Sequence, residues 1–299
     1  MATARTTDLM SEVYAAGTAV GAFNVICLEH AEAIVTGAES AHLPVILQIS
    51  ENTVAYHGRL APISLACLSL AETAAVPVAV HLDHATSEDL CLRAMDLGYS
   101  SVMFDASTLP YVDNVRSTAA LTAHAHRRGA FVEAELGIVG GKGGAHAPGA
   151  RTDPGEAAAF VAATGVDSLA VAVGTSHAMV SRDAMIDLDL IARIHAALPV
   201  PIVMHGSSGV SDELLREAVR AGMTKVNIAT HLNKAMTERV RHELAGDLSL
   251  VDPRRYLGPA RDAIAAEVGR LLRILALVSP ADPAPGRPRA PLDSAVRKL

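Results

Sequence analysis

Eight short apolar runs recur along the 299-residue chain, and stretches with helical character separate them. Several runs begin just after a proline, a residue that ends a preceding helix. Two intervening stretches, SEDLCLRAMDLG and SDELLREAVRAG, open with a serine followed by acidic residues, which is typical of a helix N-terminus. The expected strands are 21–25, 44–49, 77–82, 101–105, 130–136, 168–173, 201–205 and 224–228.

Eightfold alternation of strand and helix predicts an α/β fold, a (β/α)8 TIM barrel. The apolar residues are mainly Ala, Val, Leu and Ile, aromatic residues make up only 3% and there is no Trp, which suits parallel strands buried on both faces. An open doubly wound sheet is the alternative, but no G-x-G-x-x-G follows the first strand. We expect a single domain over residues 1–278, with helical segments after residue 247, and a disordered Pro-rich tail over residues 279–299.

The composition limits which binding partners and which cellular compartment are expected for this protein. The net charge is −7 without a long basic run, which argues against nucleic acid as a partner. No apolar stretch has the length of a membrane span or the character of a signal peptide, so we expect no membrane association. The three cysteines are odd in number and none forms a CxxC pair, which fits a reducing compartment. The sequence therefore predicts a cytoplasmic protein.

Polar residues lie at the end of every expected strand. Catalytic residues of a barrel come from the C-terminal ends of its strands, so we expect these side chains to meet at one mouth. They are Asn24, Gln48, Ser50, Asp83, His84, Asp105, Glu133, Glu135, His177, His205, Asn227 and Thr230.

Three of these strand ends carry histidine: His84, His177 and His205. Three imidazoles with an open fourth position make a catalytic zinc site, in which the metal acts as a Lewis acid. Asp83, beside one of the expected ligands, is then placed for proton transfer. Each histidine alone could be an ordinary strand-end residue, but three at corresponding ends favour the metal. His81 shares a face with Asp83 and is expected to pack or to support the site rather than bind the metal.

The segment HGSSG (205–209) precedes a helix start at Ser211 and presents small residues and backbone N–H groups. Barrels commonly bind phosphate between the loops after strands 7 and 8 and a helix N-terminus. The neighbouring segment NIAT (227–230) strengthens this expectation.

The segments HLDHATS, VEAELGIVGG, VGTSHAM, IVMHGSSGVSDE, KVNIATHL and DPRRYLGPARDAI occur in this order. Together they resemble the motif series of the class II, zinc-dependent ketose-bisphosphate aldolases of the fructose- and tagatose-bisphosphate type. The resemblance implies a (β/α)8 barrel that forms a homodimer or homotetramer. It also implies a lyase of carbohydrate metabolism and glycolysis, which reversibly cleaves a ketose bisphosphate to dihydroxyacetone phosphate and an aldehyde.

The resemblance also assigns roles to residues. It makes Asp83 the catalytic acid/base at the aldehyde-derived hydroxyl and His84, His177 and His205 the ligands of a catalytic Zn²⁺. Asp105 and Glu135 match carboxylates that hold a second position, for a divalent metal or a monovalent cation. The matched substrate-binding residues are Asn24, Gln48, Ser50, Gly206, Ser208, Asn227, Thr230 and Arg254, the last reaching the substrate from a neighbouring subunit.

Two departures from the family pattern leave alternatives open. The family loop continues VGGxED, but this chain has VGGKGG, so Gly143 and Gly144 replace the two acids. The family also has GTxHG where this chain has GTSHA, with Ala178 in place of a glycine. One alternative is a related aldolase with a different, secondary-metabolic substrate, and another is a non-catalytic sugar-phosphate binder. A barrel with a Schiff-base lysine is disfavoured, because Lys225 lies near the start of its expected strand.

Overall fold

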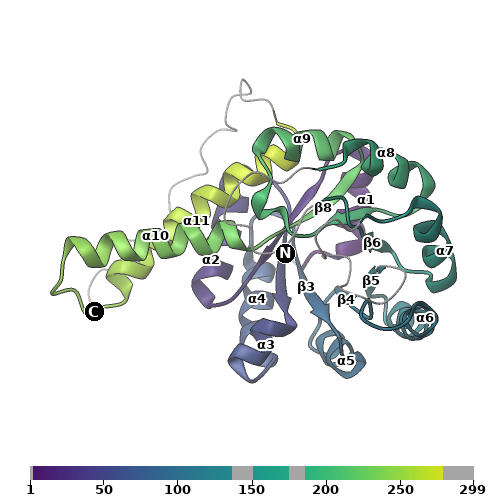
Figure 1. Ribbon diagram of the computed structural model, residues 1–299. Coiled ribbons are helices and arrows are strands. Elements are labelled where there is room, and N and C mark those ends of the chain that lie inside the picture. Colours follow the sequence, from purple (N-terminus) through teal and green to yellow (C-terminus); the bar gives the residue numbers. More distant parts are fainter. Residues whose placement is uncertain (1–2, 137–150, 175–185, 279–299) are drawn as a thin grey trace.

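The computed structural model describes residues 3–136, 151–174 and 186–278 as a closed barrel of eight parallel strands (Figure 1). The strand order around the barrel is the order in the chain. The strands are β1 (Val20–Asn24), β2 (Val45–Ser50), β3 (Val78–Ala85), β4 (Ser101–Phe104), β5 (Phe131–Glu135), β6 (Ser168–Ala170), β7 (Ile202–Met204) and β8 (Met223–Ile228).

All eight expected strands are present, so the predicted (β/α)8 barrel is confirmed. The largest differences from the expected bounds are in two strands: β3 continues through His84 to Ala85, and β6 stops at Ala170. The Pro-rich tail expected at 279–299 lies outside the described residues, and the proposed single domain over 1–278 stays a prediction.

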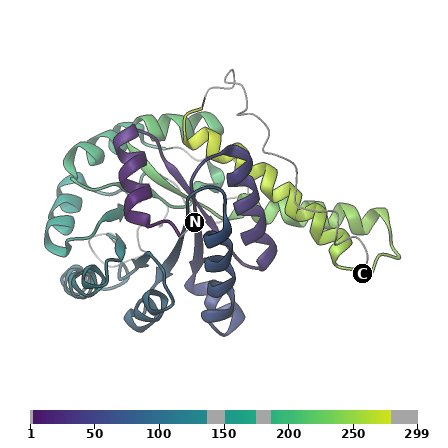
Figure 2. The same ribbon diagram turned by 180° about the vertical axis from the view of Figure 1, so that it is seen from behind.

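Helices surround the barrel and cover one of its ends (Figure 2). They are α1 (Thr6–Ala16), α2 (Leu28–Ala41), α3 (Glu51–His57), α4 (Ala61–Thr73), α5 (Glu88–Asp96), α6 (Tyr111–Arg127), α7 (Pro154–Thr164), α8 (Leu188–Ala197), α9 (Asp212–Arg220), α10 (Thr230–Gly246) and α11 (Arg254–Leu275). The two expected serine caps are confirmed: the Ser87 hydroxyl accepts from Leu90 N–H at 3.4 Å, and the Ser211 hydroxyl accepts from Leu214 N–H at 3.2 Å.

The barrel interior changes from apolar to polar along its axis. At the N-terminal end of the strands, Leu9 and Met10 of α1 pack against Val20, Ile46 and Phe131. A smaller buried cluster of Met103, Ala170 and Val203 follows. Polar and charged side chains occupy the interior toward the other end. The apolar cluster around Leu9 and Met10 therefore closes the N-terminal mouth of the barrel, and the functional groups lie at the opposite mouth.

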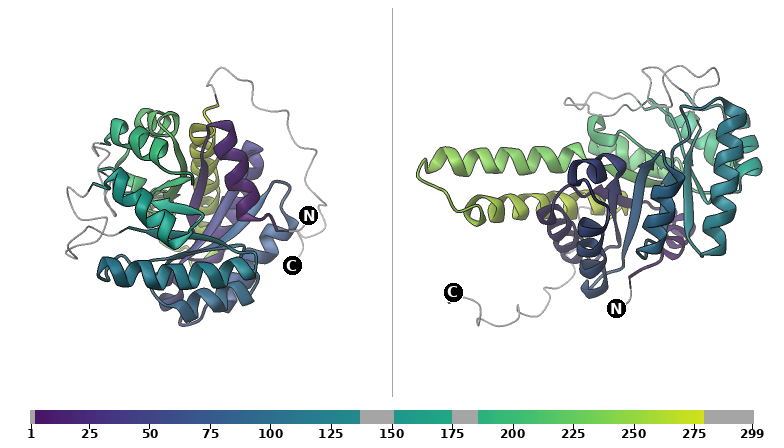
Figure 3. Two further views of the ribbon diagram at one scale, coloured as in Figure 1. Left: turned by 90° about the vertical axis from the view of Figure 1, so that its right-hand side faces the viewer. Right: turned by 90° about the horizontal axis from the view of Figure 1, so that it is seen from below.

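Helices α10 and α11 lie side by side and project from the barrel as a long arm (Figures 1 and 3). The buried half of α11 packs on α2, whereas only Leu232 of α10 is buried. Among residues 3–136, 151–174 and 186–278, no helix combines the length and the apolar character needed to span a membrane.

Candidate active site

Asp83 and His84 are consecutive residues of β3, yet both line the same pocket. Side chains of consecutive strand residues normally point to opposite faces of a sheet. Here the β3–β4 register shifts between Leu82 and Ala85, and His84 has a left-handed backbone with φ of 49°. A bulge of this kind changes the direction of a side chain. It lets the imidazole and the carboxylate reach the same side of the barrel mouth.

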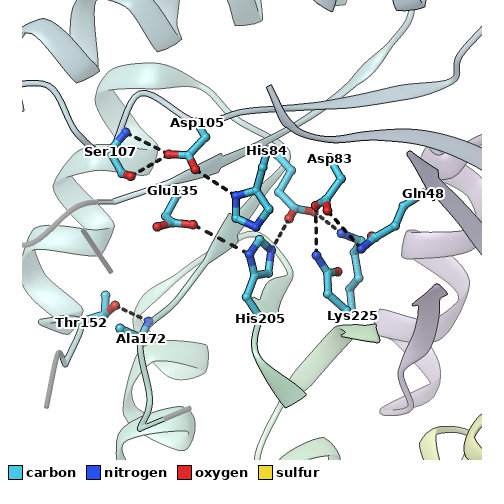
Figure 4. A network of polar contacts seen from close by, with 12 residues as sticks. Gln48, Asp83, His84, Asp105, Ser107, Glu135, Thr152, Ala172, His205 and Lys225 are labelled. Atoms are coloured by element: carbon cyan, nitrogen blue, oxygen red, sulfur yellow. Dashed lines mark hydrogen bonds and ion pairs between the residues drawn. The ribbon is translucent and has the colours of Figure 1, made fainter. Parts of the chain in front are cut away.

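Three side-chain amides hold the buried carboxylate of Asp83, and Figure 4 shows one of them, Gln48, pointing toward it. Asn24 and Gln48 donate to Oδ2 at 3.2 and 3.3 Å, and Asn227 donates to Oδ1 at 3.2 Å. Gln48 Nε2 also donates to the side-chain oxygen Oδ1 of Asn24 at 2.7 Å, which fixes the two amides relative to each other. The amides satisfy the carboxylate as an acceptor and orient it at the pocket wall.

His84 is paired with Asp105, the residue that follows β4. The His84 Nδ1 lies 2.9 Å from Asp105 Oδ2, and Asp105 Oδ1 accepts from the N–H and the hydroxyl of Ser107 at 3.1 and 2.6 Å. Burial is the largest single influence on His84 and opposes its charge, but Asp83, Asp105 and Glu135 together outweigh it and raise its pKa to about 9. Burial likewise opposes ionisation of Asp105, but the hydrogen bonds from His84 and Ser107 prevail and hold its pKa well below the usual range. The mouth therefore has a negative field that favours a bound cation.

His205 directly follows β7 and is fully buried beneath His84. The two rings meet edge to face with centroids 4.6 Å apart. Ligand atoms of Asp83, His84 and His205 all lie within 4.8 Å of one another, and the same holds for His84, Asp105 and Glu135. Imidazole and carboxylate donors in this arrangement suit a divalent transition metal such as zinc. The residues present therefore fit the metal expected from the sequence.

Two adjoining pockets open at this mouth and share Asn24, Asp83, His84 and Ala229. The first is completed by Gln48, Gly206, Ser207, Ser208, Asn227 and Thr230. Its wall contains the short 3-10 helix Ser207–Gly209 and the first residue of α10. Backbone N–H groups at such helix starts favour an anion. The second pocket extends over Ser50, Asp105, Ser107 and Glu135 toward α3.

The structure brings together most of the residues predicted from the sequence. Eleven of them line the two pockets: Asn24, Gln48, Ser50, Asp83, His84, Asp105, Glu135, Gly206, Ser208, Asn227 and Thr230. His205 lies next to His84 within the wall. Arg254 is separate from them: it begins α11, its side chain is 87% exposed, and it pairs with Asp252 at 2.8 Å. His177, Ala178, Gly143 and Gly144 lie outside the described residues.

Sequence reasoning missed a charged pair in the barrel interior. Lys225 Nζ lies 2.8 Å from Glu133 Oε2, and both side chains are almost completely buried. Lys225 precedes the site residue Asn227 by two positions, and Glu133 likewise precedes Glu135. Because side chains two residues apart in a strand point to the same face, strand alternation could have placed both on the inner face of the barrel. The burial and ion pairing of Lys225 also argue against a Schiff-base role, which needs an accessible neutral amine.

Comparison with known proteins gives consistent matches over nearly the whole chain. The family described as "Fructose-bisphosphate aldolase class-II" matches residues 4–278. Fructose-bisphosphate aldolase of Geobacillus stearothermophilus is 38% identical, over 87% of this chain and 92% of that protein. Fructose-bisphosphate aldolase of Thermus caldophilus is also 38% identical, over 86% and 92%. The crystal structure of the YdjI aldolase from Escherichia coli superposes with a TM-score of 0.80 at 30% identity, over 91% of this chain and 97% of that chain.

Proposed function

The chain belongs to the class II fructose-bisphosphate aldolase family and is therefore an aldolase, a lyase, and from this premise we propose that it is a zinc-dependent enzyme acting on a phosphorylated ketose. The proposed reaction is the reversible cleavage of a fructose or tagatose 1,6-bisphosphate type of ketose to dihydroxyacetone phosphate and an aldehyde. The observation that carries the proposal is the meeting of Asp83, His84 and His205 at a pocket whose other wall is built from helix starts.

The residues that would hold the catalytic zinc are His84 and His205, with His177 as the third ligand expected from the family resemblance. When bound, the metal supplies a Lewis acid that polarises the substrate carbonyl. Asp105 orients His84 through its Nδ1, and such carboxylate partners raise the basicity of a ligand. Glu135 and Asp105, which group with His84, would hold the second cation.

Asp83 is proposed as the base for the hydroxyl of the aldehyde half. Its carboxylate accepts the hydroxyl proton while the carbon–carbon bond breaks, and the hydroxyl carbon becomes the aldehyde. The electron pair of that bond passes to the ketone half, which takes up a proton at the same carbon to give dihydroxyacetone phosphate. Because Gly143 and Gly144 carry no carboxylate, that proton comes from a group other than a side chain at these two positions.

The phosphate of the ketone half would bind at Gly206, Ser208, Asn227 and Thr230. Gly206 has a left-handed backbone with φ of 67°, which turns the chain sharply after His205 and into Ser207–Gly209. The N–H groups at this turn and at the start of α10 supply donors without a positively charged side chain. Asn24, Gln48 and Ser50 complete the same pockets and would contact the sugar hydroxyls.

The proposal is tested by a retro-aldol assay on a sample whose metal content is also measured. Fructose and tagatose 1,6-bisphosphates are offered, triose phosphate is detected, and the assay is repeated after chelation and after return of zinc. Cleavage that is lost on chelation and restored by zinc supports the proposal. One zinc per chain without cleavage of either sugar would contradict the proposed substrate and favour a different aldol donor or a binding function.

A further inference from the structure

A charged pair lies inside the barrel beneath the proposed metal ligands. Lys225 on β8 and Glu133 on β5 are joined at 2.8 Å, with side chains 1% and 0% exposed. Strands β5 and β8 are not neighbours, so this ion pair crosses the barrel interior. An isolated ion in such a place would be strongly destabilising, and each group compensates the charge of the other. The pair therefore behaves as one neutral unit.

The same carboxylate contacts His205 through its other oxygen. Glu133 Oε1 lies 3.0 Å from His205 Nε2. An ionised carboxylate can only accept hydrogen bonds, so Nε2 carries the hydrogen that joins them. In the neutral ring, Nδ1 is then the nitrogen with the lone pair. His205 Nδ1 faces Glu135, with Oε2 at 3.8 Å (Figure 4), and Glu135 is grouped with His84 and Asp105 as a potential metal ligand.

A further titratable group near the pair is His81, which is fully buried inside the barrel. Its Nδ1 contacts the Ser101 hydroxyl at 2.8 Å, and burial together with the charge of Lys225 lowers its pKa to about 3. His81 is therefore neutral and leaves Lys225 as the cation that balances Glu133.

We propose that Lys225 and Glu133 form a positioning pair that holds His205 in the tautomer with Nδ1 available to the metal. Zinc affinity then depends on a lysine that touches neither the metal nor the substrate. This inference rests on the proposed role of His205 as a zinc ligand. It extends that role, because it says why this ring presents one nitrogen rather than the other.

The principal variant is the double substitution Glu133→Gln with Lys225→Met. It removes both charges together while keeping similar volumes, so no uncompensated ion remains in the barrel. A glutamine amide both donates and accepts, and can pair with either tautomer of His205. We expect the folded double variant to lose zinc affinity by about 10- to 100-fold, as is typical when the partner of a ligand is removed. Competition against a chromophoric chelator measures the affinity, and thermal unfolding of the metal-free proteins checks the fold.

The matched control is Ser168→Ala. Ser168 pairs in register with Glu133 on the adjoining strand, and its buried hydroxyl has no hydrogen-bond partner among the described residues. This change alters the same level of the barrel without touching the positioning pair. We expect wild-type zinc affinity from it. A loss equal to that of the double variant would overturn the proposal, because any change in the barrel interior would then have the same effect.

A direct measurement needs no variant. Nitrogen-15 NMR of the histidine rings in the metal-free wild type, with His205 assigned, should show the Nε2–H tautomer at neutral pH. A mixture of tautomers, or Nδ1–H, would overturn the positioning role even if the double variant did not fold. A folded double variant that binds zinc within about threefold of wild type would also overturn it. Absence of aldolase activity in the wild type would instead contradict the proposed function and leave the tautomer result standing.

Discussion

At the residue scale, Asp83 combines the chemical role proposed for it with a small structural one. Its carboxylate is fixed by amides of Asn24, Gln48 and Asn227, which themselves line the pocket. The proposed metal ligands His84 and His205 do not depend on Asp83 for the contacts that orient them, since Asp105 and Glu133 do this. Turnover and metal binding should therefore separate when Asp83 is changed.

We predict that Asp83→Ala lowers kcat by at least about 100-fold, the usual contribution of a positioned acid or base, while zinc remains bound at the wild-type level. Steady-state kinetics and metal analysis on one preparation measure both quantities. The control is Asp8→Ala, which removes an exposed carboxylate from α1 at the closed end of the barrel and should leave both quantities unchanged. Near-normal turnover by Asp83→Ala would remove this residue from the mechanism.

The raised pKa of His84 predicts that the stability of the metal-free protein depends on pH. Its pKa is raised from 6.5 to about 9, so protonated His84 stabilises the folded state fully below pH 6.5, and this contribution is lost as the pH rises through 9. The upper bound is about 3 kcal/mol, from 1.36 kcal/mol per pKa unit. Urea unfolding of chelator-treated wild type and His84→Asn at pH 6 and pH 9.5 measures the contribution. The stability difference between the two proteins should shrink at the higher pH, and a constant difference would show that His84 does not titrate in this window.

At the scale of elements, a polar network joins three helices behind the proposed phosphate site. Glu267 and Arg270 of α11 pair with each other at 2.7 Å, Arg270 also contacts Asp212 of α9, and His231 of α10 lies 3.3 Å from Glu267. His231 is the neighbour of Thr230, which lines the pocket. The network therefore connects the base of the arm to the start of α10.

Glu267→Gln should lower the free energy of unfolding at neutral pH by about 1 kcal/mol, a value reduced for partial exposure. Burial opposes ionisation of Glu267, but Arg270 and His231 outweigh it and lower its pKa to about 2. The stability contributed by ionised Glu267 is therefore present above pH 4.5 and is lost as the pH falls toward 2. The difference in the free energy of unfolding between Glu267→Gln and wild type should become smaller in acid.

The control for Glu267→Gln is Glu243→Gln, which breaks a single i,i+4 pair with Arg239 within α10, about as exposed as the Glu267–Arg270 pair but joined to no other helix. A surface pair of this kind contributes little, so its effect should be the smaller of the two. Equal effects in urea unfolding would mean that the network between helices contributes nothing beyond an ordinary surface ion pair.

At the scale of the whole molecule, the arm of α10 and α11 bears on assembly. Its turn carries Leu248 and Val251, which are 94% and 88% exposed, and Arg254 follows at the start of α11. Exposed apolar residues at a protruding tip are typical of an interaction surface. We therefore keep the prediction of a homo-oligomer in which Arg254 of one subunit serves the pocket of another.

This arrangement predicts complementation between inactive subunits. Arg254→Ala should reduce kcat/KM by about 10- to 100-fold, the effect of losing a hydrogen bond to a charged group. When the Arg254→Ala and Asp83→Ala proteins are mixed in equal amounts and exchange subunits, about half of the symmetric dimers contain one subunit of each kind. One of the two sites in each mixed dimer is then intact, so the mixture should recover up to about a quarter of wild-type activity. A mixture of Asp83→Ala with His84→Ala should recover nothing, since both changes lie in the same pocket. Equal recovery in both mixtures, or none in either, would contradict a shared site.

The sequence by itself determined the strands and most of the pocket residues. Strand bounds came within a few positions because apolar runs, prolines and serine caps act locally, as at Ser87 and Ser211. Residues such as Asn24, Gln48 and Asn227 could be grouped because parallel strands bring their carboxyl ends to one mouth. The family resemblance then supplied their expected roles.

The tertiary structure alone decided how these residues meet. A regular strand would separate Asp83 from His84, and the left-handed backbone that brings them together depends on the register between β3 and β4. The Lys225–Glu133 pair joins residues 92 positions apart, across strands that only barrel closure brings together. Neither feature has a local signal in the chain, because both arise from the packing of distant backbone segments around a common interior.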